Sequence, residues 1–205
     1  MTKSSDVKGM LKDAGILFLI TLISGLVLGF VYELTKEPIR VQQELAIQKA
    51  CKEVFAEAES FELLDYVLDT SMQAEIAENG VEIGKVYEAK DANGVCKGYV
   101  VESTSGEGYG GDIVLYVGIS TEGTVNGISI LSISETPGLG MNAESVLVPQ
   151  FEKVPAARFE YTKTGSEDAN VIDAISGATI TTEAITEAVN AAVRIVMDDL
   201  LKGGN

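Results

Sequence analysis

AGILFLITLISGLVLGFVY, residues 14–32, is a run of 19 residues without a charged side chain. As a helix rising about 1.5 Å per residue it would be roughly 28 Å long, close to the hydrocarbon thickness of a bilayer, about 30 Å. Tyr32 lies where an interfacial aromatic residue is expected. A signal peptide and a buried core helix are the alternatives, but a signal core is shorter and ends at a small-residue cleavage site, which YELTKEP lacks. The run predicts a retained membrane-spanning helix over residues 14–33, after a tail of residues 1–13.

The charges that flank this span do not decide its orientation. Cationic residues stand on both sides of it: Lys3, Lys8 and Lys12 before it, and Lys36, Arg40, Lys49 and Lys52 after it. Because an excess of Lys and Arg marks the cytoplasmic side, these counts are indecisive. The small N-terminal tail and the large acidic body favour a tail inside the cytoplasm and a body outside it.

Composition excludes several classes of function. Fifteen Lys and Arg residues against 31 Asp and Glu give a net charge of −16, which argues against binding to nucleic acid. The chain has no His, so Ser-His-Asp and Cys-His relays and His-based zinc sites are excluded. Its two cysteines, Cys51 and Cys96, are too few for a self-contained iron–sulfur cluster or thiolate zinc site. No metal site is predicted, and redox chemistry here would need an organic cofactor.

The two cysteines leave two readings open. They could pair in an oxidising compartment, or they could be a buried helix thiol and a buried strand thiol. We favour the second reading.

The chain beyond the span predicts one α+β body. A helical pattern begins at Pro38 and indicates a stalk helix within residues 34–60. Residues 60–80 are expected to form short helices and turns that close at Asn79-Gly80. KVYEAK, Asn93-Gly94 and VCKGYVVES then predict a hairpin with a type I′ turn, because Asn-Gly supplies the positive φ angles of that turn.

Further elements follow with the same periodicities. DIVLYVGIS and TVNGISILSIS, joined by TEG, predict a second pair of antiparallel strands, and a glycine-rich loop over residues 106–111 precedes them. Residues 142–150 are expected to form a short helix and ARFEYTK a strand. An amphipathic helix is predicted from about Thr182 to Leu201. Its apolar stripe comprises Ile185, Val189, Ala192, Val193, Val196 and Leu200.

Two loops are candidates for binding. In Glu135-Thr136-Pro137-Gly138-Leu139-Gly140, Pro-Gly fits the centre of a type II turn, in which glycine has positive φ. Such a loop lets the backbone approach a flat ligand closely, although a plain strand-to-helix turn is the alternative.

The second loop is Asp173-Ala174-Ile175-Ser176-Gly177-Ala178-Thr179-Ile180-Thr181-Thr182-Glu183. Thr181 or Thr182 is expected to cap the helix that follows, and Glu183 suits the positive end of its dipole. A helix N-terminus behind a Gly-Ala loop is a natural phosphate cradle. An ordinary capped helix start is the alternative.

Together these two motifs resemble the family of covalent FMN-binding domains. The carriers of the resemblance are Asp-x-x-Ser-Gly-Ala-Thr at residues 173–179 and Glu-Thr-Pro-Gly-Leu-Gly at residues 135–140, in the family's order. Its best-known members are the G subunit of the Rnf ion-translocating ferredoxin:NAD⁺ oxidoreductase and the C subunit of the Na⁺-translocating NADH:quinone reductase. The architecture is also similar, with one anchor and then a single extracytoplasmic α+β domain, here residues 61–205. The length of the chain is more similar to that of the Rnf G subunit than to that of the quinone-reductase C subunit, which is usually longer.

The resemblance implies specific roles for residues of both motifs. Thr179 would be esterified to the phosphate of FMN by a flavin transferase that reads the motif, with Asp173 at its acidic position. Gly177 and Ala178 would leave room for the transferase and the phosphate, and Ser176 would also belong to the cofactor-binding residues. Thr136, Gly138, Leu139 and Gly140 would line the flavin, with Glu135 fixing the loop. Tyr109 is a weaker candidate for an opposite wall.

The resemblance also implies an electron-transfer subunit that is not catalytic alone. The resemblance implies partner subunits of the A, B, C, D and E type. This chain has neither a dinucleotide fingerprint nor cluster ligands, so ferredoxin oxidation and NAD⁺ reduction would take place on other subunits. Membrane lipid would surround the anchor. Three alternatives stay open: the quinone-reductase C subunit, a stand-alone flavinylated extracytoplasmic carrier, and a membrane-anchored scaffold without cofactor.

Overall fold

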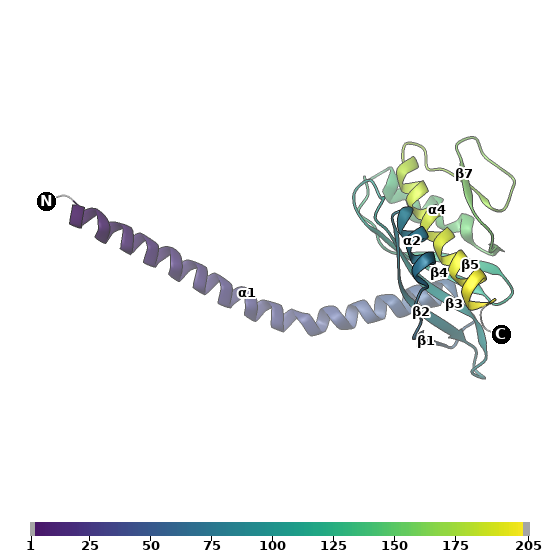
Figure 1. Cartoon of the computed structure of the whole chain (residues 1–205), viewed down its shortest axis with the longest axis horizontal. Coiled ribbons are helices and arrows are strands. Elements are labelled where there is room, and N and C mark those ends of the chain that lie inside the picture. The colour runs from purple at the N-terminus through teal and green to yellow at the C-terminus, as the bar shows by residue number, and fades with distance from the viewer. Residues whose placement is uncertain (1–2, 203–205) are drawn as a thin grey trace. The chain divides into compact units, whose positions relative to one another are not determined.

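The computed structural model describes residues 3–202, which divide into two compact units. One unit ends at Leu45 and the other begins at Ala46. The first unit is most of α1 (Lys3–Val54), a single long helix (Figure 1). Its side chains from residue 9 to residue 45 are all exposed, the apolar run included. Among the described residues α1 is the one helix long and apolar enough to cross a membrane, in agreement with the predicted span.

The helix α1 passes through Pro38 without interruption. The predicted span and the predicted stalk are therefore parts of one helix, although proline removes one backbone donor from it. The helix ends at Val54, whereas the stalk was expected to reach residue 60.

The second unit is built on a six-stranded antiparallel sheet whose strands follow one another in chain order. The strands are β1 (Ser60–Leu64), β2 (Val81–Lys90), β3 (Cys96–Ser105), β4 (Ile113–Ser120), β5 (Thr124–Ser132) and β6 (Val154–Pro155). The two predicted strand pairs are confirmed as β2–β3 and β4–β5. Because each strand pairs with the next along the chain, short turns suffice to connect β2 through β5.

The sheet is covered on both faces. On one face the last turns of α1 contribute Ala50, Cys51 and Val54 to a cluster that includes Val100 and Tyr116 of the sheet. On the other face lies α4 (Thr179–Arg194), which crosses the sheet in Figure 1. Neighbouring strand residues point to opposite faces, so that burial on both sides explains why β4 is almost continuously apolar.

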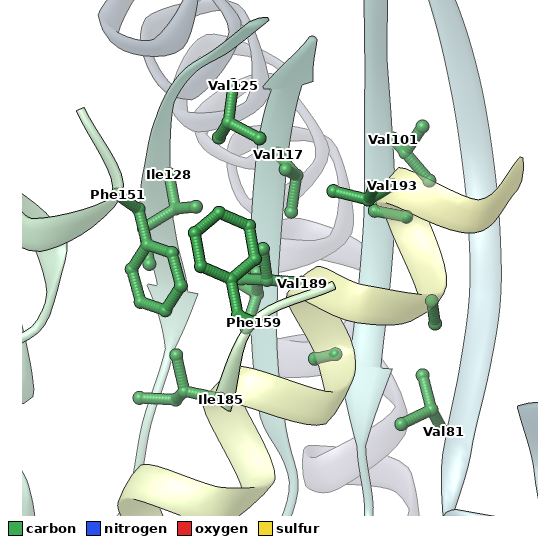
Figure 2. Packing of buried hydrophobic residues seen from close by; sticks show 14 of the residues in the cluster. Val81, Val101, Val117, Val125, Ile128, Phe151, Phe159, Ile185, Val189 and Val193 are labelled. Carbon is green, nitrogen blue, oxygen red and sulfur yellow. The ribbon is translucent and has the colours of Figure 1, made fainter. Parts of the chain in front are cut away.

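The main core lies between the sheet and α4. Ile185, Val189 and Val193 of the helix belong to the same buried cluster as Val117 and Val101 of the strands (Figure 2). The remainder of the predicted apolar stripe, Ala192 and Val196, is also buried, and Leu200 packs at its edge. Two phenylalanines, Phe151 and Phe159, complete the core. Their rings pack edge to face with their centroids 5.1 Å apart. The helix stripe predicted from the sequence is thus confirmed.

Several connecting elements complete the body. They are α2 (Thr70–Glu78), η1 (Gly140–Asn142), α3 (Ala143–Val146), η2 (Val148–Phe151), β7 (Glu160–Thr162), β8 (Val171–Asp173) and η3 (Ile195–Leu200). The strands β7 and β8 pair in parallel as a separate two-stranded sheet. The short helix predicted over residues 142–150 is present as α3 between two 3₁₀ turns. β7 occupies the centre of the strand predicted for ARFEYTK.

Two sequence predictions in this part of the chain are wrong. Residues 60–64 were assigned to helices and turns but form β1, which pairs with β2 along its whole length. The β2–β3 turn is not type I′, because only Gly94 has positive φ there, at 77°. The side chain of Asp91 instead accepts hydrogen bonds from the amides of Asn93 (2.8 Å) and Val95 (3.0 Å). These two hydrogen bonds stabilise a type I turn, in which the Gly94 amide donates to the Asp91 carbonyl at 2.9 Å.

Both cysteines are free. Cys51 is buried in α1, as predicted, whereas Cys96 at the start of β3 is only partly buried. Burial raises the pKa of the Cys51 thiol to about 12, because the thiolate would lose its hydration beneath the sheet.

Candidate functional site

The loop over residues 135–140 contains the predicted type II turn. The Leu139 amide donates a hydrogen bond to the Thr136 carbonyl at 3.1 Å, and Gly138 has a φ of +78°. The turn projects into solvent, since a Cβ placed on Gly138 would meet no atom within 4 Å. Asn142 stabilises the turn from below by donating to the Gly138 carbonyl at 3.0 Å. The glycine is needed here for its backbone angle and not for lack of space.

Glu135 joins this loop to the glycine-rich loop over residues 106–111. Its side chain is only 7 % exposed, and its carboxylate accepts a hydrogen bond from the Gly110 amide at 3.2 Å. A Cβ on Gly108 or on Gly140 would lie within 2.9 Å of a carboxylate oxygen of Glu135. Two glycines therefore make room for one buried carboxylate, and Glu135 lies where a loop-fixing residue was predicted.

The second loop is held on both sides by backbone hydrogen bonds. After β8, the Ala174 amide donates to the Thr162 carbonyl at 2.8 Å, and the Ala178 amide donates to the Ile175 carbonyl at 3.0 Å. Gly177 has a φ of +79° inside this second turn. Ser176 and Gly177 are exposed at its tip, and the Asp173 side chain is exposed at its base.

The helix α4 begins three residues earlier than predicted. Thr179 is its first residue, and Ala178 occupies the N-cap without any side-chain cap. The prediction that Thr181 or Thr182 caps the helix is wrong, because both are buried within its first turn. Instead, the Thr182 hydroxyl accepts from the Ile175 amide (3.1 Å) and donates to the Ala178 carbonyl (3.0 Å), which ties the turn to the helix.

The missing cap leaves the first turn of α4 suited to an anion. The amides at the start of a helix have no partner within the helix, and here no side chain takes them. The helix dipole adds a partial positive charge at the same place. Thr179 is partly exposed at this point, so its hydroxyl lies at the helix end that favours a phosphate.

The two loops, far apart in sequence, lie against each other. A Cβ on Gly177 would lie 3.1 Å from Cδ2 of Leu139, and one on Gly140 would lie 2.6 Å from Oγ1 of Thr181. The fold thus brings the loop over residues 135–140 to the start of α4. The predicted site residues of both loops gather at one end of the body.

The apolar surface at this end includes residues that the sequence analysis did not single out. Ile180 follows Thr179 and is 50 % exposed, and Met141 follows Gly140 and is also exposed. With Leu139, which is 40 % exposed, they place apolar side chains beside both loops. An isoleucine between threonines had no distinguishing sequence signal. Tyr109 is 71 % exposed and packs little against its surroundings, so the structure gives no independent support to an opposite wall.

Ile180 also lines an acidic hollow of about 490 Å³. The hollow is lined by Glu78, Asn79, Glu107, Ile180, Glu183, Ala184 and Glu187. Glu183 also accepts a hydrogen bond from the Tyr161 hydroxyl at 3.3 Å. Desolvation and the charge of Glu183 raise the pKa of Tyr161 above its usual value. The carboxylates around this hollow disfavour an anionic group inside it.

Two family models match the chain. The model of the FMN-binding domain matches residues 108–194, which contain both loops and all of α4. The model of the RnfG N-terminal region matches residues 1–54, which contain the whole of α1.

Characterised relatives resemble the chain over nearly its full length. The G subunit of the Na⁺-translocating ferredoxin:NAD⁺ oxidoreductase complex of Acetobacterium woodii is 33 % identical, over 93 % of either chain. The G subunit of the proton-translocating ferredoxin:NAD⁺ oxidoreductase complex of Clostridium ljungdahlii is 32 % identical, over 96 % of either chain. Among solved structures, NqrC of Shewanella oneidensis aligns with a TM-score of 0.47 at 20 % identity, over 68 % of this chain and 80 % of that one.

Proposed function

The chain belongs to the family of G subunits of ion-translocating oxidoreductase complexes, and we propose from this premise that it relays electrons through FMN esterified to Thr179. Its FMN-binding domain makes it a redox subunit of a membrane complex, and it is not catalytic alone. When bound, FMN supplies the electron transfer, and the protein supplies tethering, orientation and electrostatics.

The observation that carries the proposal is the position of Thr179 at the uncapped start of α4. A phosphoester on its hydroxyl would bring a negative charge to the free amides and the positive dipole end of this helix. Thr181 and Thr182 stand nearby in sequence, but both are buried. Thr179 therefore combines a reachable hydroxyl with the electrostatics that favour a phosphodiester.

The surroundings of Thr179 also fit a flat, largely apolar ring system. Ile180, next to Thr179 in sequence, and Leu139, which lies near Gly177, offer exposed apolar surface. Gly138 has no side chain, and a Cβ placed on it would meet no atom within 4 Å, so a planar ligand can approach the backbone there. Ser176, Gly177 and Ala178 add no bulk around the attachment point. Asp173 remains exposed and free for recognition by a flavin transferase.

We place the folded body on the extracytoplasmic side of the membrane. The first 45 residues carry five cations and five acids, so the whole net charge of −16 lies in the body. Placing the short tail in the cytoplasm leaves this acidic body outside, where a covalent tether keeps the cofactor from diffusing away. A single span encloses no ion path, so ion translocation belongs to the other subunits of the complex.

The proposal is tested by the mass of the chain after co-expression with a flavin transferase. The unsubstituted chain should carry the mass of one phosphoester-linked FMN and show a fluorescent band after denaturing electrophoresis. Thr179→Ala should lose both signals while the body stays folded. Thr70→Ala is the matched control, because Thr70 occupies the same first position in α2. Peptide mapping that places FMN on another residue, or a Thr179→Ala band that still fluoresces, would refute the assignment.

A further inference from the structure

Gln150 holds the backbone of Asp173 with both ends of its side-chain amide. Its Oε1 accepts from the Asp173 amide at 2.7 Å, and its Nε2 donates to the Asp173 carbonyl at 3.1 Å. The same Nε2 donates to the Val146 carbonyl at 2.8 Å. The side chain thus takes the place that the peptide group of a neighbouring strand would take along β8.

The small sheet that precedes the loop over residues 173–179 needs such support. β7 and β8 have three residues each, and two-stranded sheets of this size are marginally stable by themselves. Asn190 of α4 makes an equivalent amide pair with Phe159, just before β7, at 2.7 Å and 3.0 Å. One side-chain amide therefore holds the chain that enters β7, and another holds the end of β8.

The position of Gln150 gives its contact a consequence for the site. Gln150 lies in η2, and η1, α3 and η2 follow directly on the loop over residues 135–140. The two loops also contact each other by close packing, which is not directional. These contacts join Leu139 to Gly177 and Gly140 to Thr181. The amide pair of Gln150 adds two directional hydrogen bonds between the same two regions of the chain.

We propose that Gln150 is a positioning residue, which fixes the loop over residues 173–179 against the loop over residues 135–140 and thereby the orientation of a flavin carried at Thr179. The orientation part rests on the proposed function, whereas the hold on Asp173 does not. Gln150 acts through the backbone of Asp173 and needs no contact with the cofactor.

The experiment compares three variants of the full chain, each co-expressed with the flavin transferase. Gln150→Met removes both hydrogen bonds at similar size. Gln150→Glu keeps the shape and the acceptor but turns an oxygen toward the carbonyls of Asp173 and Val146. Gln73→Met is the control, because Gln73 is exposed in α2. Intact mass gives FMN loading, visible circular dichroism gives flavin ordering, and amide hydrogen exchange reports on residues 173–178.

Loading should be equal in all the proteins, because Thr179 and its motif are unchanged. In Gln150→Met and Gln150→Glu the amides of residues 173–178 should exchange roughly three- to tenfold faster, as expected for the loss of one or two hydrogen bonds. The visible circular dichroism of the flavin should weaken in both variants and stay unchanged in Gln73→Met. Glu fills the same space as Gln but lacks the amide N–H groups. Faster exchange in Gln150→Glu would therefore show that the hydrogen bonds hold the loop, and not the volume of the side chain.

Two outcomes would overturn the inference separately from the proposed function. Normal FMN loading with unchanged exchange and dichroism in Gln150→Met would refute the positioning role alone, as would a Gln150→Glu protein that behaves like the unsubstituted chain. Absence of FMN from the unsubstituted chain would refute the proposed function and the orientation role with it. Faster exchange in the Gln150 variants would then support only the hold on Asp173.

Discussion

Gly140 and Gly138 stand two residues apart in one loop, yet the structure requires them to be glycine for different reasons. In Gly140→Ala the new Cβ would lie 2.6 Å from Oγ1 of Thr181 and 2.8 Å from Oε2 of Glu135. Both distances are shorter than van der Waals contact, so the side chains of Thr181 and Glu135 must move away from residue 140. Overpacking of this kind costs about 1–3 kcal/mol. In Gly138→Ala the Cβ meets nothing within 4 Å, and only the φ of +78° is unfavourable, at about 1–2 kcal/mol.

Asparagine distinguishes the two mechanisms, because it tolerates positive φ better than other non-glycine residues. Gly138→Asn should therefore recover part of the stability lost in Gly138→Ala, whereas Gly140→Asn should be worse than Gly140→Ala. Denaturant unfolding of the detergent-solubilised chain measures this by near-ultraviolet circular dichroism, since six of the seven tyrosines follow residue 45. A Gly140→Ala midpoint equal to that of the unsubstituted chain would refute the close approach between the two loops. FMN loading should persist in Gly140→Ala, with weaker visible dichroism.

Three further predictions follow from orientation, burial and loop closure. A reporter that is active only in the cytoplasm, fused after Asn205, should be inactive, and a reporter active only outside the cytoplasm should work; the reverse pattern would contradict the proposed topology. Iodoacetamide at pH 8 should leave Cys51 unmodified in the folded chain, because its pKa of about 12 keeps the thiol protonated, and unfolding should expose it. Since this pKa is raised on folding, the thiol's contribution to stability should be intact below about pH 9 and be lost as the pH rises toward 12, which pH-dependent unfolding measures. Thr182→Val should destabilise the body by about 1–3 kcal/mol in denaturant unfolding, because it leaves the Ile175 amide without its acceptor; an unchanged midpoint would show that the amide finds another partner.

The central strands and the core helix were predictable because their patterns are long. β2 to β5 each have eight to ten residues, and the stripe on α4 repeats over four turns. The short elements were not predictable in the same way. SFELL forms β1 only because its partner β2 is present, and its five residues carry no clear alternation. β8 is three residues held by β7 on one side and by Gln150 on the other.

The errors at turns and caps have a common physical cause. Asn93-Gly94 favoured a type I′ turn. The carboxylate of Asp91, however, accepts hydrogen bonds from two amides of the turn and stabilises a different turn geometry. Thr181 and Thr182 suggested a cap, but the turn around Gly177 lets the helix begin at Thr179. In both places a side chain bonds to backbone groups other than those that the local pattern suggested: Asp91 to the turn amides, and Thr182 to the Ile175 amide and the Ala178 carbonyl. The sequence pointed to the two loops that the fold brings together, whereas Gln150 and Ile180 depend on tertiary contacts that no local pattern announces.

The exposure of the two loops gives a physical reason why the proposed flavin would need a covalent link at Thr179. Thr136, Gly138, Ser176 and Gly177 are all exposed, so that this surface is open to solvent. Sites that retain a ligand by noncovalent contacts usually bury about 70–90 % of its surface, which an open pair of loops does not provide. A phosphoester to Thr179 would replace burial as the source of retention. The same openness would leave one face of the flavin free to approach a partner subunit, which is the arrangement that electron transfer between subunits requires.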